Sequence, residues 1–141
     1  IHFHKAAVRP GKPILYARFP DGTHYLGLPG NPISAATGLR FFGMPLVRHI
    51  TGTAPEVPIT TKLTHANTKR HSFRFFAKAR LTLSSAGTPE VTLLTGQESY
   101  KIKPLLSMNA WAEVAEDQHE LGIGDAVRVW PLMPGAFRFG D

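Results

Sequence analysis

The segment 28–34, Leu-Pro-Gly-Asn-Pro-Ile-Ser, constrains the fold of this chain more than any other stretch. Pro29 and Pro32 hold φ near the helical value, and Pro32 lacks an N–H, which suits the first position of a helix. Asn31 directly before it is a preferred N-cap residue. The segment therefore predicts the end of a strand, a stiff turn and the start of a helix. Unpaired N–H groups and the helix dipole at such an end can hold an anion.

Most of the net positive charge lies in the part of the chain that contains this turn. Residues 1–54 contain six basic residues and one acid, Asp21, whereas residues 55–141 are nearly balanced, so the first part holds +5 of the formal net charge of +6. A local excess of this kind favours an anionic small molecule or a nucleic acid as partner.

The composition excludes several kinds of site and of membrane association. The chain has no cysteine, which excludes disulfides and thiolate metal sites and agrees with a reducing cytoplasm. No apolar run reaches the ~20 residues of a membrane span, so we expect no membrane partner. Because the sequence begins at Ile1 inside a predicted strand, we expect it to be a fragment of a longer protein.

The first part of the sequence predicts strands and one helix. Partial alternation over residues 2–8 indicates a strand, and segments 14–19 and 24–28 form a hairpin around the turn Pro20–Thr23. A helix follows from about Pro32 to His49, kinked by Pro45 and ended by Gly52. Spacings of three and four predict one buried stripe on this helix, formed by Ala35, Leu39, Phe42, Leu46 and Ile50.

Helical periodicity disappears after Thr53-Ala54-Pro55. Five short strand candidates separated by turn signals follow, at 57–63, 73–83, 90–94, 110–115 and 126–132. Such a series predicts a small barrel or sandwich. The chain is therefore expected to contain an α/β fragment over residues 1–54 and an all-β barrel domain over residues 55–141.

The sequence contains little evidence for a metal site, a serine hydrolase site or a nucleotide-binding loop. His2 and His4 share a strand face but have no third ligand near them in sequence, and no HExxH, GxSxG, GxGxxG or Walker pattern is present. Segment 69–80 interleaves basic and aromatic residues, as a platform for single-stranded nucleic acid would. One face of that strand must supply the barrel core, however, so we expect no nucleic-acid partner.

Taken together, these segments resemble the C-terminal part of the MoeA family, the molybdopterin molybdenumtransferases, which includes the E domain of gephyrin. Residues 28–35 look like the family signature LPGNPVSA, and segment 9–13 is similar to its KPGKP segment. Segments 97–99 and 107–110 are similar to the QGS and SLGNC-like stretches of the family's β domain. The resemblance covers about residues 2–134.

The resemblance implies a function in molybdenum cofactor biosynthesis. The family takes adenylylated molybdopterin and molybdate, hydrolyses the adenylate with a divalent metal, usually Mg²⁺, and inserts molybdenum into the dithiolene. It implies a cytoplasmic, four-domain homodimer in which residues 1–54 are the last strands and helix of a MogA-like molybdopterin-binding domain. The Mg²⁺ ligands and a glycine-rich loop are expected upstream, so this fragment is expected to be inactive alone.

The resemblance also implies a set of residues that bind molybdate or molybdopterin. Lys5 and Arg9 match two family lysines near the oxyanion, Lys78 stands where the family usually has Arg, and Glu98 replaces a glycine. A carboxylate at Glu98 could repel molybdate, face solvent or pair with Lys101. The predicted binding residues are Lys5, Arg9, Pro29, Asn31, Pro32, Ser34, Lys78 and Ser99.

Two alternative functions stay open at this point. One is a non-catalytic interaction or scaffold module, as the related domain of gephyrin also serves. The other is an oligonucleotide-binding barrel, which would show salt-dependent binding of single strands.

Overall fold

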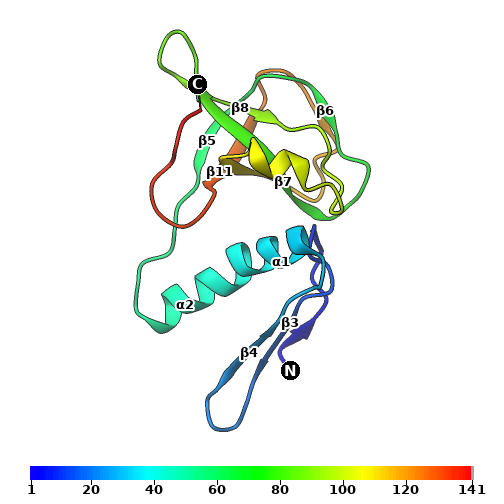
Figure 1. The fold of residues 1–141 in the computed structure, drawn as a ribbon, viewed down its shortest axis with the longest axis vertical. Helices are drawn as coiled ribbons and strands as arrows, with labels where there is room; N and C mark the ends of the chain where they lie inside the picture. Colours follow the sequence, from blue (N-terminus) through cyan, green and yellow to red (C-terminus); the bar gives the residue numbers. More distant parts are fainter. Residues whose placement is uncertain (141) are drawn as a thin grey trace.

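A closed five-stranded barrel forms the second part of the molecule, as shown in the computed structural model, which describes residues 1–140 (Figure 1). The barrel order is β7–β8–β5–β11–β9, and the pairing of β7 with β9 closes it. The five predicted strands are confirmed, with bounds β5 (Ile59–Leu63), β7 (Arg74–Leu83), β8 (Pro89–Leu93), β9 (Ala110–Val114) and β11 (Ala126–Pro131).

The long strand β7 is buried on both faces along most of its length. Because side chains alternate along a strand, Phe75, Ala77 and Leu81 enter the barrel core, while Phe76 and Lys78 lie on the outer face. The outer face is covered as well, since Phe76 stacks on Phe41 of the helix at 3.8 Å between ring centroids. Strand β7 therefore joins the barrel to the first part of the chain.

Three short elements of the barrel region were not predicted from the sequence. Strands β6 (Asn67–Thr68) and β10 (Glu120–Leu121) form a two-residue antiparallel pair, and Lys103–Leu106 forms a 3-10 helix, η2. Elements of this length contain too few residues to show a period.

The predicted hairpin is confirmed, with β3 (Leu15–Arg18) antiparallel to β4 (His24–Gly27). The single strand expected over residues 2–8 is wrong. Lys5 has φ of 70°, which is the left-handed region, and the chain divides there into β1 (Phe3–His4) and β2 (Val8–Arg9). Strand β1 pairs with β3, whereas β2 leaves that sheet and pairs in parallel with β7 of the barrel.

The predicted helix is confirmed as one continuous run of three segments, α1 (Pro32–Gly38), a π-helical turn η1 (Leu39–Gly43) and α2 (Met44–Ile50). The kink at Pro45 stays a prediction; the residues before it form the π turn, in which the Met44 N–H donates to the Leu39 carbonyl five residues earlier. Gly52 has φ of +69° and follows the helix end, as expected.

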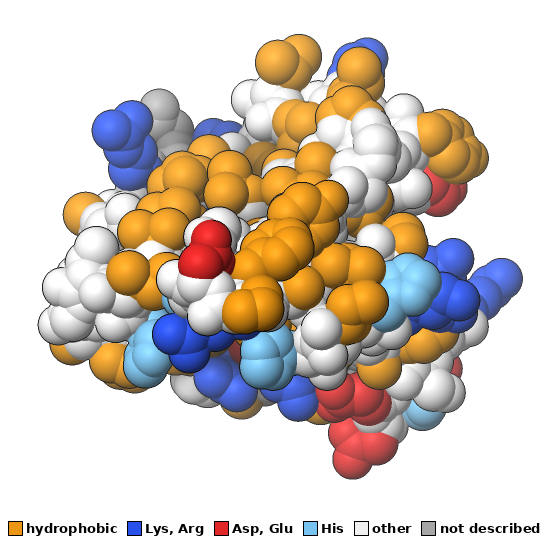
Figure 2. Space-filling model, turned by 90° about the horizontal axis from the view of Figure 1, so that it is seen from below, with side chains coloured by type: hydrophobic (Ala, Val, Ile, Leu, Met, Phe, Trp, Pro, Cys, Tyr) orange, Lys and Arg blue, Asp and Glu red, His pale blue; other side chains and the backbone are white. Residues whose placement is uncertain are grey.

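The stripe predicted for the helix is only partly buried, because Ala35, Phe42 and Leu46 are half-buried. Leu39 is 46% exposed and Ile50 is 55% exposed, while the buried positions include Ile33, Thr37 and Arg40. Phe42 of the predicted stripe packs against the cluster that contains Phe76 and Trp111. The ring stacking and the ion pair with the barrel part come from Phe41 and Arg40, which the spacing did not select. Figure 2 shows the hydrophobic side chains that gather on the face seen from below. Within residues 1–140, no helix has both the length and the apolar character needed to cross a bilayer.

Arg40 makes the main polar contact between the helix and the barrel. Its guanidinium donates to both carboxylate oxygens of Glu56, at 2.7 and 2.9 Å, and to the Pro131 carbonyl at 3.1 and 3.2 Å. Arg40 is 2% exposed, so this bidentate pair is shielded from solvent. The first and second parts of the chain are thus held in a defined orientation.

Candidate functional site

A cavity of ≈ 840 Å³ lies where the first loop, the helix start and two barrel loops meet. Strand pairing places Arg9 opposite Phe75 of β7, which brings the 9–13 loop against the barrel. At Gly11 an added Cβ would lie 3.5 Å from the Ser34 carbonyl oxygen, so this loop also runs close to the helix start. Barrel residues 67–71 and 97–100 complete the lining.

The cavity brings together three of the eight predicted binding residues. Arg9, Ser34 and Ser99 line it, although they come from β2, α1 and the loop before η2. The other five do not line it, namely Lys5, Pro29, Asn31, Pro32 and Lys78. The contacts of Asn31 and Lys78 show that these two residues hold the backbone next to the cavity.

Asn31 caps the helix as predicted, and in doing so it occupies the N–H groups of the first turn. Its Oδ1 accepts from Ile33 N–H at 3.1 Å and from Ser34 N–H at 3.3 Å, and its carbonyl accepts from Ala35 N–H at 2.8 Å. The unpaired donors expected at this helix end are therefore already engaged. Ser34 lines the cavity, and its side-chain hydroxyl is the donor that this capping leaves unused.

Lys78 lies behind the cavity wall rather than in it. The side chain is 1% exposed, and Nζ donates to the carbonyls of Gly96 at 2.7 Å, Glu98 at 3.2 Å and Lys101 at 3.0 Å. An ammonium has three donors, so all are used here. Burial lowers the pKa of Lys78 below its ordinary value. Lys78 thus fixes the loop that presents Ser99.

Gln97 fixes the same loop from the other side. Its Oε1 accepts from the Lys78 N–H at 2.9 Å, and its Nε2 donates to the carbonyls of Lys78 at 2.8 Å and Leu94 at 2.6 Å. The amide thus bonds the edge of β7 as the peptide group of a neighbouring strand would. Next to it, Glu98 pairs with Lys101 at 3.1 Å, the third of the arrangements considered for this carboxylate.

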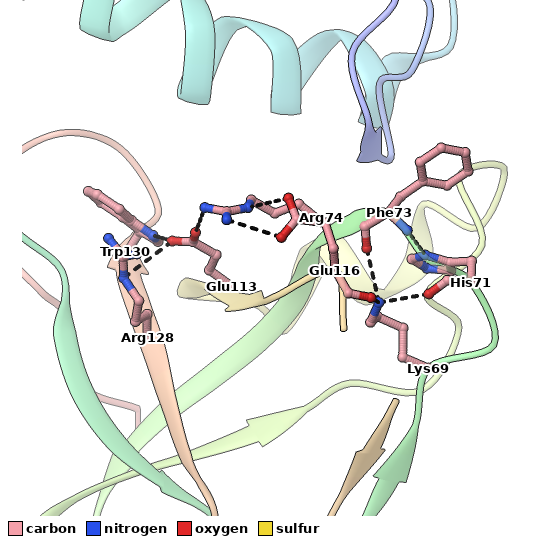
Figure 3. Close-up of polar contacts among 8 residues, drawn as sticks. All are labelled: Lys69, His71, Phe73, Arg74, Glu113, Glu116, Arg128 and Trp130. Carbon is pink, nitrogen blue, oxygen red and sulfur yellow. Dashed lines mark hydrogen bonds and ion pairs between the residues drawn. The ribbon is translucent and has the colours of Figure 1, made fainter. Parts of the chain in front are cut away.

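Lys69 is a second buried lysine that holds a loop at the cavity. Its Nζ donates to the carbonyls of His71 at 2.7 Å, Phe73 at 3.1 Å and Glu116 at 2.9 Å (Figure 3). Burial lowers its pKa as well. Sequence reasoning identified Lys69 only as part of a basic run, because carbonyl acceptors carry no side-chain signature.

His71 lines the cavity next to Lys69. The Phe73 N–H donates to Nδ1 of His71 at 3.3 Å, and the His71 ring meets the Phe75 ring edge to face at 5.3 Å between centroids. Burial lowers the pKa of His71, and the positive charges of Arg9 and Lys69 lower that pKa further. At neutral pH the ring is neutral, with its proton on Nε2.

An ion-pair network centred on Arg74 lies on the barrel surface, next in the chain to the cavity residues Phe73 and Phe75. Arg74 donates to Glu116 at 3.0 and 3.1 Å and to Glu113 at 2.7 Å, and Glu113 also accepts from the Trp130 indole N–H at 2.8 Å (Figure 3). The hydrogen bond to Glu116 raises the pKa of Arg74. Glu113 and Arg74 also line a separate cavity of ≈ 620 Å³ beneath the helix.

The basic and aromatic run over residues 69–80 is largely enclosed. Lys69, Phe75, Phe76 and Lys78 are all buried, so they do not form the exposed stacking platform that the oligonucleotide hypothesis required. The absence of a nucleic-acid partner stays a prediction. Across residues 1–140 no group of three or more His, Cys, Asp or Glu side chains is placed to hold a metal ion.

The molecule combines a closed five-stranded barrel with a hairpin-and-helix unit, and the two-residue strand β2 joins them. A basic cavity lies between the two parts, so the chain belongs to a class of barrel proteins with a candidate binding site at the edge of the barrel. A family model of the MoeA C-terminal region (domain IV) matches residues 60–132. The chain belongs to this family, and the predicted resemblance is confirmed.

Curated relatives agree with this assignment. A molybdopterin molybdenumtransferase of Staphylococcus aureus (strain Mu50) is 40% identical over 91 residues, which are 63% of this chain and 22% of that protein. The corresponding protein of Synechococcus elongatus is 32% identical over 131 residues, 92% of this chain and 31% of that protein. The chain thus spans about a fifth to a third of the length of these relatives.

Solved structures show the same fold. A molybdopterin biosynthesis moeA protein of Pyrococcus horikoshii superposes with a TM-score of 0.70 at 21% identity, over 95% of this chain and 32% of that one. A molybdenum cofactor biosynthesis protein of Pyrococcus furiosus gives a TM-score of 0.67 at 22% identity, over 91% and 44% of the two chains.

Proposed function

We propose that this chain is the C-terminal part of a molybdopterin molybdenumtransferase, the enzyme that inserts molybdate into adenylylated molybdopterin. One observation carries the proposal: three residues separated along the sequence, Arg9, Ser34 and Ser99, line one basic cavity. The names of the curated relatives support the same activity.

Molybdate is a tetrahedral dianion, and the cavity offers the groups that such an ion requires. Arg9 supplies a planar fork of donors that is always charged, and Ser34 and Ser99 supply hydroxyl donors. Lys78 and Gln97 hold the loop that carries Ser99, so we assign them a positioning role. In this proposal Pro29, Asn31 and Pro32 act in the same way, by fixing the helix start that presents Ser34.

The remaining features of the enzyme are proposed for the longer protein. The exposed apolar face of the helix supports membership of residues 1–54 in a larger, MogA-like α/β domain, because apolar surfaces of this kind usually pack against another element. Mg²⁺ would be held by residues outside this chain, so no step assigned to these residues passes through it. A homodimer and a cytoplasmic location stay predictions.

Titration of the 141-residue chain with molybdate tests the proposal. We expect Arg9→Gln to weaken binding by about ten- to a hundredfold, the usual range for a lost charged hydrogen bond, and Ser34→Ala by about three- to tenfold. Arg18→Gln, at an exposed arginine on the hairpin, is the matched control and should change little. Equal molybdate affinity in all three variants and the parent chain would refute the proposed site.

A further inference from the structure

Three side chains at the cavity have no place in the molybdate site described above. Lys12, Arg70 and His71 all line the cavity, yet none of them is among the predicted binding residues. Contacts through the Phe73 ring join Lys12 to His71. Lys12 Nζ lies 5.2 Å from the centre of the Phe73 ring, and that ring lies 6.0 Å from the His71 ring. Arg70 directly precedes His71 in the chain.

This group also adjoins the proposed molybdate residues. His71 packs against Phe75, and Phe75 lies opposite Arg9 in the pairing of β2 with β7. Consequently Arg9 is close enough to His71 for its charge to affect the imidazole. The two groups form neighbouring parts of one cavity wall.

The cations of this group are free to bind a ligand. Within residues 1–140, neither the Lys12 ammonium nor the Arg70 guanidinium takes part in a hydrogen bond or ion pair, and both side chains are exposed. The other cations nearby are engaged, since Lys69 donates to three carbonyls and Arg74 pairs with two glutamates. Together with Arg9, the unpaired cations Lys12 and Arg70 therefore supply the free positive charge of this cavity, while Glu98, which also lines it, is paired with Lys101.

His71 adds a neutral donor of fixed direction. Because Nδ1 already accepts from the Phe73 N–H, the neutral ring carries its proton on Nε2. Two cations and one fixed N–H donor suit the oxygens of a phosphate group, which accept several hydrogen bonds and carry negative charge.

The cavity is also large enough for an organic ligand. Its volume of ≈ 840 Å³ falls within the range of roughly 300–1,000 Å³ that is typical of sites for organic ligands. A tetrahedral oxyanion at Arg9 and Ser34 would leave most of this volume free. Phe73, Phe75 and Tyr100 line part of the remainder and offer apolar surface next to the cations.

We propose that Lys12, Arg70 and His71 form a phosphate subsite that holds the phosphate or pyrophosphate group of an organic ligand beside the oxyanion at Arg9. Identification of that ligand with the phosphorylated organic substrate rests on the proposed function. The subsite itself depends only on the arrangement of these side chains. Burial of Lys69 and Lys78 favours a small ligand over an extended nucleic-acid strand, because the basic run is not exposed along its length.

Calorimetric titration of the 141-residue chain with inorganic pyrophosphate tests the subsite. Arg70→Gln should weaken pyrophosphate binding at least about tenfold, and Lys12→Gln about three- to tenfold, because each removes a charged donor. Arg18→Gln and Lys62→Gln remove the same charges at exposed positions away from the cavity, and should change affinity less than twofold. An equal loss in the variants and their controls, or no pyrophosphate binding by the parent chain, would overturn the proposal.

Two further titrations distinguish this subsite from the molybdate site and from a nucleic-acid surface. If the subsites are distinct, Arg70→Gln should leave molybdate affinity within about twofold of the parent, and molybdate should still bind when pyrophosphate is saturating. A chain that binds pyrophosphate through Arg70 but does not bind molybdate would refute the proposed function and leave the subsite intact. Affinity that rises steadily with the length of a single-stranded oligonucleotide would instead identify a nucleic-acid surface and overturn the subsite.

Discussion

Replacement of Lys78 by methionine tests whether this residue positions the Ser99 loop. Methionine keeps an unbranched side chain of similar length and removes only the ammonium. The three carbonyls of Gly96, Glu98 and Lys101 then lose their common donor, while the barrel strand beneath them is unchanged.

The size of the effect follows from the exposure of the loop. A buried carbonyl left without a donor costs about 1–3 kcal/mol, so three fully buried groups would cost several times as much. Here Glu98 is exposed and Gly96 is half-buried, so the loop can open and its carbonyls can bind water. The loss is therefore limited to the free energy of opening the loop, which we expect to reduce the free energy of unfolding by about 1–3 kcal/mol.

Urea unfolding and amide hydrogen exchange measure the two parts of this prediction. In Lys78→Met, amides of residues 96–101 should exchange at least about tenfold faster, in line with a loss of more than about 1.4 kcal/mol of local stability. Lys78→Arg should retain most of the protection, because guanidinium also supplies several donors. Lys62→Met, at an exposed lysine of β5, is the control. Unchanged exchange of this loop in Lys78→Met would refute the positioning role.

Three further predictions concern stability. The lowered pKa of His71 means that the unfolded chain binds a proton at higher pH than the folded chain, so the free energy of unfolding should fall as the pH drops below 6.5. In urea unfolding at about pH 7.5 and about pH 5, His71→Gln should make the difference between the two free energies smaller. An identical difference in the variant and the parent would contradict the prediction. Arg40→Met leaves the enclosed Glu56 carboxylate unpaired and should lower the free energy of unfolding by about 3–5 kcal/mol, of which adding Glu56→Gln should restore a part. An unchanged urea midpoint in Arg40→Met would show that the pair does not stabilise the fold. Lys5→Gly should raise the free energy of unfolding by about 1 kcal/mol by relieving the left-handed backbone, whereas Lys5→Ala should not; equal effects of the two would exclude backbone strain as the cause.

Local patterns were sufficient to predict most of the fold. The hairpin follows from the turn Pro20–Thr23, the helix start follows from Asn31 and Pro32, and the barrel strands follow from short apolar segments between turns. Each of these signals resides in neighbouring residues. The division at Lys5 and the exposure of Leu39 and Ile50 on the helix could not be predicted in this way, because both depend on the elements that pack next to them.

The candidate site was only partly predictable for a related reason. Family resemblance identified Arg9, Ser34 and Ser99, and the structure places them around one cavity. It assigned Lys78 to the same wall, but a lysine that bonds three carbonyls has the same one-letter signature as one that binds an anion. The distinction depends on tertiary contacts that no local pattern contains.

The pairing of β2 with β7 bears on how such a protein can be divided. Strand β8 covers one part of the β7 edge, and β2 covers the part at Arg74 and Phe75. Separation of the chain after residue 54 would leave this second part with unpaired N–H and C=O groups, and open strand edges recruit strands from other molecules. A barrel that was transferred alone to another protein would therefore need a substitute strand at this edge, or it would exchange strands with its own copies. The barrel thus depends on residues 8–9 to complete one edge of β7, although the two parts of the chain differ in composition.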